Sequence, residues 1–96
     1  MDVKTVTVLG AGTMGHGIAH AAMVAGFETV LYDVSQPQLD NGRSAIDAVI
    51  QKGVDLGKVS ADDALAMRGR LRLTTAVADA VRDADLVTEG RRSRST

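Results

Sequence analysis

The stretch that decides the fold is Val3-Lys-Thr-Val-Thr-Val-Leu9-Gly10-Ala-Gly12-Thr-Met-Gly15, near the start of a chain of 96 residues. Its first part, Val3–Leu9, is rich in β-branched residues and predicts a short buried strand. From Thr13 to about Ala25 the apolar residues recur at spacings of three and four, which is typical of a helix face. The stretch therefore predicts a strand, a glycine turn and a helix in direct succession.

The glycine spacing, Gly10-x-Gly12-x-x-Gly15, is that of a turn that holds the pyrophosphate of a dinucleotide. Gly10 permits the tight turn out of the strand, and Gly12, which has no Cβ, lets the backbone approach the phosphates. Gly15 lets the helix pack closely on the sheet. The first amides of the helix have no partner within it, so they can donate to phosphate oxygens.

An acid stands where such a site needs one. Glu28–Tyr32 predicts a second strand, and Asp33 at its end lies 18 residues after Gly15. A carboxylate there can accept hydrogen bonds from the adenosine ribose and would repel a 2′-phosphate, which favours NAD over NADP. The predicted cofactor-binding residues are Gly10, Ala11, Gly12, Thr13, Met14, Gly15 and Asp33. The alternative is a turn used only for packing, with Asp33 as a solvated loop acid.

The rest of the chain continues the alternation of strands and helices. Ser35 is the expected N-cap of a long helix that reaches about Lys52, with Gln38 placed to complete a capping box and Gly53 to end the helix. Further predicted elements are a helix at 61–67 capped by Ser60, a strand at 71–74, a helical turn at 77–81 and a strand at 85–88. The expected fold class is α/β, a partial Rossmann-type doubly wound parallel sheet of about four strands.

The composition excludes several classes of function. The chain has no Cys and a formal net charge of −1, and it carries no basic stripe interleaved with aromatic residues. We therefore expect no disulfide, no thiolate metal site and no nucleic-acid partner. No apolar run reaches the roughly 20 residues of a membrane span, so we expect no membrane association and a cytoplasmic location. His16 and His20 are interpreted as exposed helix residues rather than metal ligands, and Gly17 as a point of close approach to the sheet or to the cofactor.

The stretch Val8-Leu-Gly-Ala-Gly-Thr-Met-Gly-His-Gly-Ile-Ala19 resembles the 3-hydroxyacyl-CoA dehydrogenase family, which includes the 3-hydroxybutyryl-CoA dehydrogenases. The segments Val30–Val34 and Ala84–Glu89 are similar to that family's second strand with its ribose-binding acid and to its fourth strand. The resemblance covers roughly residues 3–89 and implies a Rossmann domain that uses NAD. In the full enzyme it implies NAD-dependent oxidation of a 3-hydroxyacyl-CoA to the 3-oxoacyl-CoA, in a cytoplasmic homo-oligomer.

The resemblance also implies what this chain lacks. Family members are nearly three times as long, and their catalytic histidine, its partner glutamate and the substrate domain lie downstream of the matched region, so no catalytic residue is predicted here. We expect residues 1–90 to be the first part of the NAD-binding domain. Residues 91–96 depart from the family and are expected to form a disordered tail, whether through truncation, a frameshift or cloning.

Two other functions stay open at this point: a stand-alone, non-catalytic nucleotide-binding module, and a fragment of a β-hydroxyacid dehydrogenase with a related glycine turn. For a fragment of the family, the missing strands would leave a sheet edge and apolar helix surface uncovered, which predicts self-association.

Overall fold

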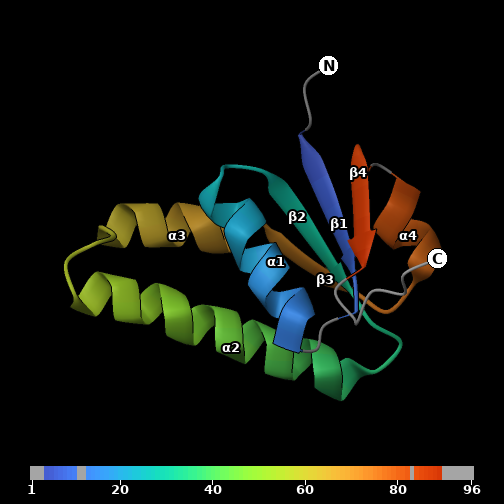
Figure 1. Cartoon of the computed structure of the whole chain (residues 1–96), viewed down its shortest axis with the longest axis horizontal. Helices are drawn as coiled ribbons and strands as arrows, with labels where there is room; N and C mark the ends of the chain where they lie inside the picture. Colours follow the sequence, from blue (N-terminus) through green and yellow to red (C-terminus); the bar gives the residue numbers. More distant parts are fainter. Residues whose placement is uncertain (1–3, 11–12, 83, 90–96) are drawn as a thin grey trace.

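The computed structural model describes residues 4–10, 13–82 and 84–89. These residues form four strands and four helices that alternate, except that two helices follow the second strand (Figure 1). In chain order the elements are β1 (Thr5–Leu9), α1 (Thr13–Val24), β2 (Glu28–Tyr32), α2 (Gln36–Asp55), α3 (Ala61–Gly69), β3 (Leu71–Thr74), α4 (Val77–Arg82) and β4 (Leu86–Glu89).

The four strands form one parallel sheet in the order β3-β2-β1-β4. The chain winds outward from β1 through β2 to β3, and then returns through α4 to place β4 on the free side of β1. This reversal is the defining feature of a doubly wound sheet, and ligands bind beside it at the carboxyl ends of the strands. The expected partial Rossmann fold is therefore confirmed.

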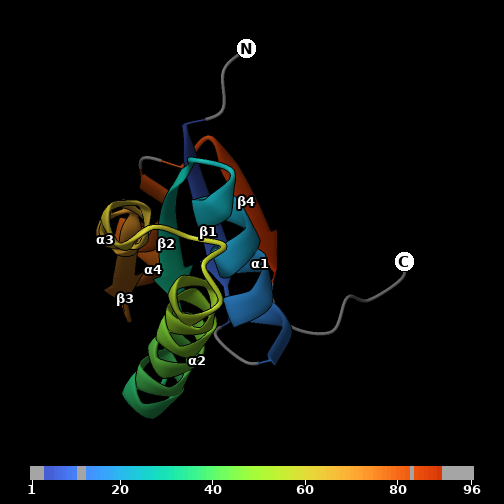
Figure 2. The same ribbon diagram turned by 90° about the vertical axis from the view of Figure 1, so that its left-hand side faces the viewer.

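The main hydrophobic core lies between the sheet and α1, α2 and α3. β1 and β2 contribute Val6, Val8 and Leu31 to it, and the facing helix side chains include Met23 and Ile46. All five are at most 4% exposed. In Figure 1, α2 and α3 form a hairpin that extends beyond the sheet, and Figure 2 looks onto the closed end of this hairpin.

The opposite face of the sheet carries α4, a helix of six residues. The buried hydroxyl of Thr7 donates to the carbonyl oxygen of Ala80 at 2.5 Å, which fixes α4 on the central strand. Beyond α4 the cover is incomplete, because Val87, which lies beside Thr7 in the register of β1 and β4, is 44% exposed. The two faces of the sheet are thus packed to different degrees.

The helix starts expected from the sequence are confirmed. Ser35 Oγ accepts from the amide of Gln38 at 3.4 Å, and Ser60 Oγ accepts from the amide of Asp63 at 3.0 Å. The Ser35 amide, which a capping box would pair with the Gln38 side chain, donates to Asp33 Oδ1 at 3.0 Å instead. Asp33, two residues before the N-cap, therefore fills the role that the sequence assigned to Gln38.

The expected end of α2 at Gly53 is wrong, because the helix continues to Asp55. A glycine at position 53 makes room for Val59, which packs back against the helix. A Cβ on Gly53 would lie 2.9 Å from Cγ2 of Val59, closer than two carbon atoms normally approach. The chain turns instead at Gly57, whose φ is +74°. Gly26, at φ +97°, ends α1 as expected.

The bounds of β2 and β3 are those expected from the sequence, and the remaining boundaries differ by at most two residues; β4 begins at Leu86 instead of Asp85. Val3, Ala11, Gly12 and the expected tail at 91–96 lie outside the described residues. No helix in the described part of the chain combines the length and the apolar character needed to cross a membrane.

Candidate functional site

The glycine turn and the second strand meet at the carboxyl edge of the sheet. The register of β1 and β2 ends on the pair Leu9 and Tyr32. One residue further on, the amide of Gly10 donates to the carbonyl oxygen of Tyr32 at 2.7 Å. Gly10 has a φ of +101°, which a residue with a Cβ rarely adopts. The first glycine therefore makes the turn that the sequence analysis assigned to it.

Helix α1 begins directly beyond this turn, with Thr13 and Met14 as its first residues. Gly15 is buried, in agreement with the close helix packing expected of the third glycine. The first turn of α1 contains no acidic residue, so no side-chain carboxylate there opposes the positive end of the helix dipole. The amides at this end are placed to receive an anionic group.

Asp33 lies beside the glycine turn, because Tyr32, which accepts the Gly10 amide, immediately precedes it. Its own amide donates to the carbonyl oxygen of Thr74 at 3.3 Å, which ties it to the end of β3. Its half-buried carboxylate is oriented by the bond from the Ser35 amide. The structure thus brings together the two parts of the predicted site. The glycine turn precedes α1 and Asp33 follows β2, and the two meet at the same edge of the sheet.

Two residues at this edge had no place in the sequence analysis. Thr74 holds the Asp33 backbone through its carbonyl and accepts the Ala76 amide on Oγ1 at 3.1 Å. Val34 follows Asp33 and is 79% exposed. The sequence offered one signal for Val34: it is a large apolar residue directly after Asp33, the acid that follows β2.

Three residues of α1 differ from their sequence interpretation. His16 and His20 are half-buried instead of exposed. Gly17 is exposed, and a Cβ added to it would meet no heavy atom within 4 Å. The predicted close approach of Gly17 to the sheet is therefore wrong, whereas its approach to a cofactor stays a prediction.

The arrangement of a glycine turn, an open helix N-terminus and an acid after the second strand agrees with a family model. Residues 5–91 match the model described as the NAD-binding domain of 3-hydroxyacyl-CoA dehydrogenase. The chain belongs to the 3-hydroxyacyl-CoA dehydrogenase family. This membership confirms the family resemblance and the cofactor, NAD.

Relatives within the family are moderately similar in sequence. The chain is 38% identical over 88 residues to the fatty acid oxidation complex subunit alpha of Idiomarina loihiensis, and the match covers 92% of this chain and 12% of the relative. It is 38% identical over 87 residues to a 3-hydroxybutyryl-CoA dehydrogenase of Bradyrhizobium diazoefficiens, covering 91% of this chain and 29% of the relative. The chain therefore spans less than a third of the length of these relatives.

Solved structures of the family superimpose closely on this chain. The 3-hydroxybutyryl-CoA dehydrogenase of Escherichia coli K12 matches with a TM-score of 0.88 at 37% identity, over 93% of this chain and 19% of the other. The enzyme from Ralstonia eutropha matches with a TM-score of 0.90 at 28% identity, over 98% of this chain and 33% of the other. The strand order and the glycine turn thus belong to a fold that these dehydrogenases share.

Proposed function

We propose that the chain binds NAD with the pyrophosphate over the glycine turn and the first amides of α1. The residues assigned to this site are Gly10, Ala11, Gly12, Thr13, Met14, Gly15 and Asp33. The observation that carries the proposal is the bond from the Gly10 amide to Tyr32, because it joins the phosphate-binding turn to the strand that ends at Asp33. The first turn of α1 has no acidic residue, so no carboxylate there would repel a phosphate bound at the start of the helix.

Asp33 is assigned to the ribose of the adenosine. Each carboxylate oxygen can accept more than one hydrogen bond, so Asp33 can accept from ribose hydroxyls as well as from the Ser35 amide. The same negative charge would lie next to a 2′-phosphate and repel it, so we expect a preference for NAD over NADP. Val34, at the open edge beyond the acid, is assigned to one side of the adenine ring, where its apolar surface would be covered by the base.

The chemical reaction is assigned to the longer proteins that contain this domain. We infer that the full enzyme, in the cytoplasm, oxidises a 3-hydroxyacyl-CoA to the 3-oxoacyl-CoA: the hydride on the 3-hydroxyl carbon goes to NAD⁺ and the hydroxyl proton is released. Residues 1–90 are assigned to the first part of the NAD-binding domain and residues 91–96 to a tail that departs from the family, although the family match itself runs to residue 91. This chain alone is expected to give no NADH oxidation with acetoacetyl-CoA, and turnover would contradict the assignment of the catalytic residues to the rest of the enzyme.

Titration calorimetry with NAD and NADP tests the site. Asp33→Ala should weaken NAD binding about 10- to 100-fold, the effect of losing hydrogen bonds to a charged group. Asp33→Asn keeps an acceptor for the Ser35 amide but removes the charge, so it should lower the preference for NAD over NADP about tenfold or more.

The matched control is Asp55→Asn at the far end of α2, where the carboxylate accepts only a local bond from Gln51 among the described contacts. It should leave both affinities unchanged. Equal binding of NAD and NADP by the unaltered chain, or no loss in Asp33→Ala, would refute the role of Asp33.

A further inference from the structure

Ser35 makes two hydrogen bonds at the junction between β2 and α2. Its Oγ accepts from the amide of Gln38 at 3.4 Å and so begins the helix, and its own amide donates to Asp33 Oδ1 at 3.0 Å. With φ −104° and ψ 117°, Ser35 has the extended backbone of an N-cap residue. One residue therefore joins the start of α2 to the carboxylate that is assigned to the ribose.

The backbone and the carboxylate of Asp33 are held by different groups. The Asp33 amide donates to the carbonyl oxygen of Thr74 at 3.3 Å, which fixes the backbone against β3. The carboxylate can still turn about the two side-chain bonds of the residue. The Ser35 amide restricts this rotation by holding Oδ1. Because the donor is a backbone group, its direction follows the backbone conformation of Ser35.

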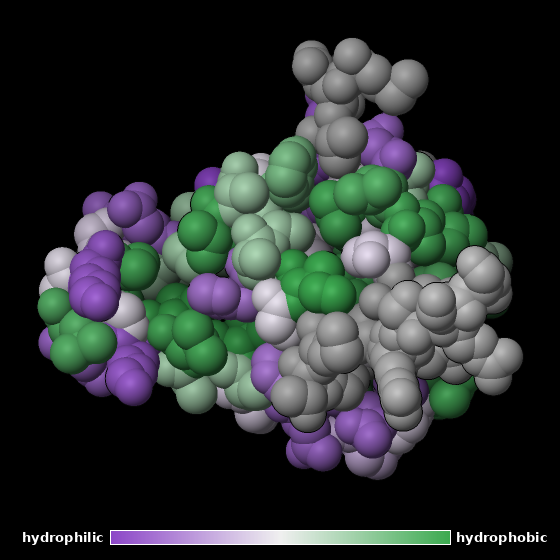
Figure 3. Space-filling view, in the orientation of Figure 1, coloured by the Kyte–Doolittle hydropathy of each residue, from purple (hydrophilic) through white to green (hydrophobic). Residues whose placement is uncertain are grey.

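The first turn of α2 has little tertiary support. Gln36, Pro37 and Gln38 are exposed. Leu39 is the first buried residue of the helix. Figure 3 shows hydrophilic surface at the lower edge of the molecule, where α2 begins. The order of this turn therefore depends on the Ser35 cap more than on packing.

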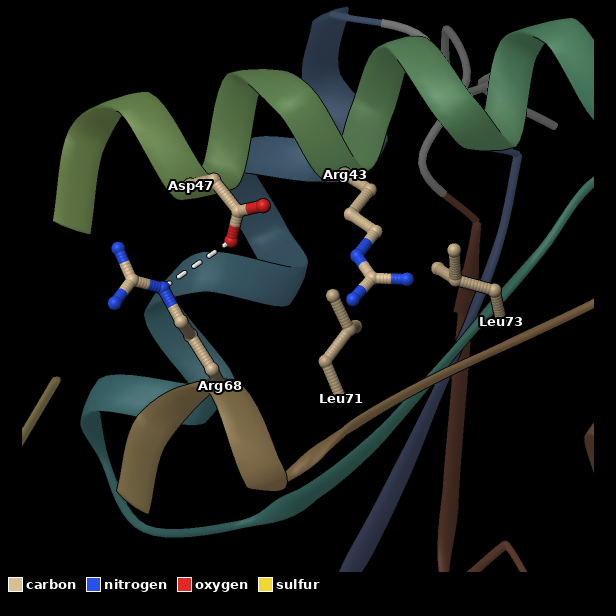
Figure 4. Close-up of a pocket in the computed structure, with 5 residues that line it drawn as sticks. All are labelled: Arg43, Asp47, Arg68, Leu71 and Leu73. Atoms are coloured by element: carbon tan, nitrogen blue, oxygen red, sulfur yellow. Dashed lines mark ion pairs between the residues drawn. The ribbon is translucent and has the colours of Figure 1, made fainter. Parts of the chain in front are cut away.

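The remainder of α2 is held independently of this cap. Ile46 and Ile50 are at most 1% exposed and belong to the main core. On the side that faces α3, Asp47 Oδ1 lies 3.4 Å from Arg68 Nε, and Figure 4 shows the two side chains directed at each other. Loss of the cap should therefore loosen Ser35 and the first turn without displacing the helix.

We propose that Ser35 is a positioning residue of the cofactor site, through which the first turn of α2 and the ribose contact of Asp33 become ordered together. The inference rests on the proposed NAD site. A formed cap keeps Ser35 extended, with its amide directed at Asp33 Oδ1, so the carboxylate is aligned before the ribose arrives. An acceptor that is already aligned loses less conformational freedom on binding, and the difference appears as affinity.

The coupling acts in both directions. If the ordered cap favours NAD, bound NAD favours the ordered cap by the same factor. NAD should therefore reduce fraying of the first turn of α2. The start of α3 is the internal comparison, because Ser60 Oγ likewise accepts from the amide of Asp63, at 3.0 Å. This second cap follows the opposite end of α2, far from Asp33 (Figure 1).

Two serine-to-alanine variants separate this role from helix stability. Ser35→Ala and Ser60→Ala each remove one N-cap hydroxyl, so they should lower the thermal midpoint by comparable amounts. In titration calorimetry, Ser35→Ala should weaken NAD binding about three- to tenfold, whereas Ser60→Ala should change it less than about twofold. Ser35→Thr keeps the hydroxyl and should bind NAD within about twofold of the unaltered chain. Equal NAD affinities of the two alanine variants would overturn the proposal.

A double-mutant cycle tests whether Ser35 acts through Asp33. In the Asp33→Ala background the Ser35 amide has no carboxylate to hold. Adding Ser35→Ala should then weaken NAD binding less than about twofold further. A role of Ser35 in helix stability alone would give the same loss of affinity in both backgrounds, and that result would overturn the proposal.

Amide hydrogen exchange of the unaltered chain tests the coupling without a substitution. Saturating NAD should slow exchange of the Gln38 amide about three- to tenfold and that of the Asp63 amide less than about twofold. Equal slowing at the two amides would overturn the coupling. NAD binding that is unchanged in Ser35→Ala would overturn this inference and leave the proposed function intact. Failure of the unaltered chain to bind NAD would overturn both.

Discussion

The two faces of the sheet differ in what covers them. On one face, α1, α2 and α3 cover β1 and β2 with a continuous core that includes Val8, Met23 and Ile46, none of them exposed. On the other face, α4 is held through Thr7, and the half-exposed Val87 lies beyond it. The difference shows that the larger part of the core lies between the sheet and the first three helices.

The largest expected effect compares a side chain from each region. Ile46→Ala removes a fully buried side chain and should lower the free energy of unfolding by about 2–5 kcal/mol. Val87→Ala, at 44% exposed, should cost less than about 1 kcal/mol. Urea denaturation at low protein concentration measures both. Similar losses of unfolding free energy in the two variants would mean that the two faces of the sheet contribute equally to stability.

A second comparison uses two buried threonines on opposite faces. Thr7→Val leaves the Ala80 carbonyl without its buried donor and detaches α4, which should cost about 1–3 kcal/mol. Thr29→Val removes a local bond to the Phe27 carbonyl and should cost about 0.5–1.5 kcal/mol. The same unfolding measurements apply, and a smaller loss in Thr7→Val would indicate that α4 does not depend on this bond.

A smaller effect is expected at the end of α1. Arg70 Nη1 donates to the carbonyl oxygen of Met23 at 3.0 Å, and the last turn of α1 has no basic residue of its own. Arg70→Ala should therefore cost about 1 kcal/mol, the typical value for a hydrogen bond at a helix terminus. Arg72→Ala, on the exposed side of β3, is the control and should change the unfolding midpoint little.

The smallest effect is a pH dependence at the amino ends of β1 and β4. Asp85 Oδ2 accepts from the amides of Lys4 and Thr5 at 2.9 and 3.0 Å, and these bonds lower the pKa of Asp85 below its ordinary 3.8. The stabilisation is present above the unfolded-state pKa and is lost as the pH falls through the lower folded-state value.

Asp85→Asn should therefore lose stability at neutral pH and show a shallower decline below about pH 4 than the unaltered chain. Unfolding midpoints measured from neutral to acidic pH give both curves. Parallel curves would show that another carboxylate dominates the acid response.

Much of the fold could be predicted because its signals are local. The β-branched run before Gly10, the caps at Ser35 and Ser60 and the positive-φ Gly26 each act over a few residues. The end of α2 could not be predicted in this way, because the Gly53 contact is made by Val59 from the following loop.

The sequence by itself determined the glycine turn, the acid after the second strand and the alternation of strands and helices, since each rests on backbone preferences of adjacent residues. Only the tertiary structure decided that the strands lie in the order β3-β2-β1-β4 and that Gly10 and Asp33 are joined through Tyr32. It also decided that Asp85 binds the start of β1. Strand pairing joins residues far apart in the chain, and no local pattern specifies which backbone groups will find partners.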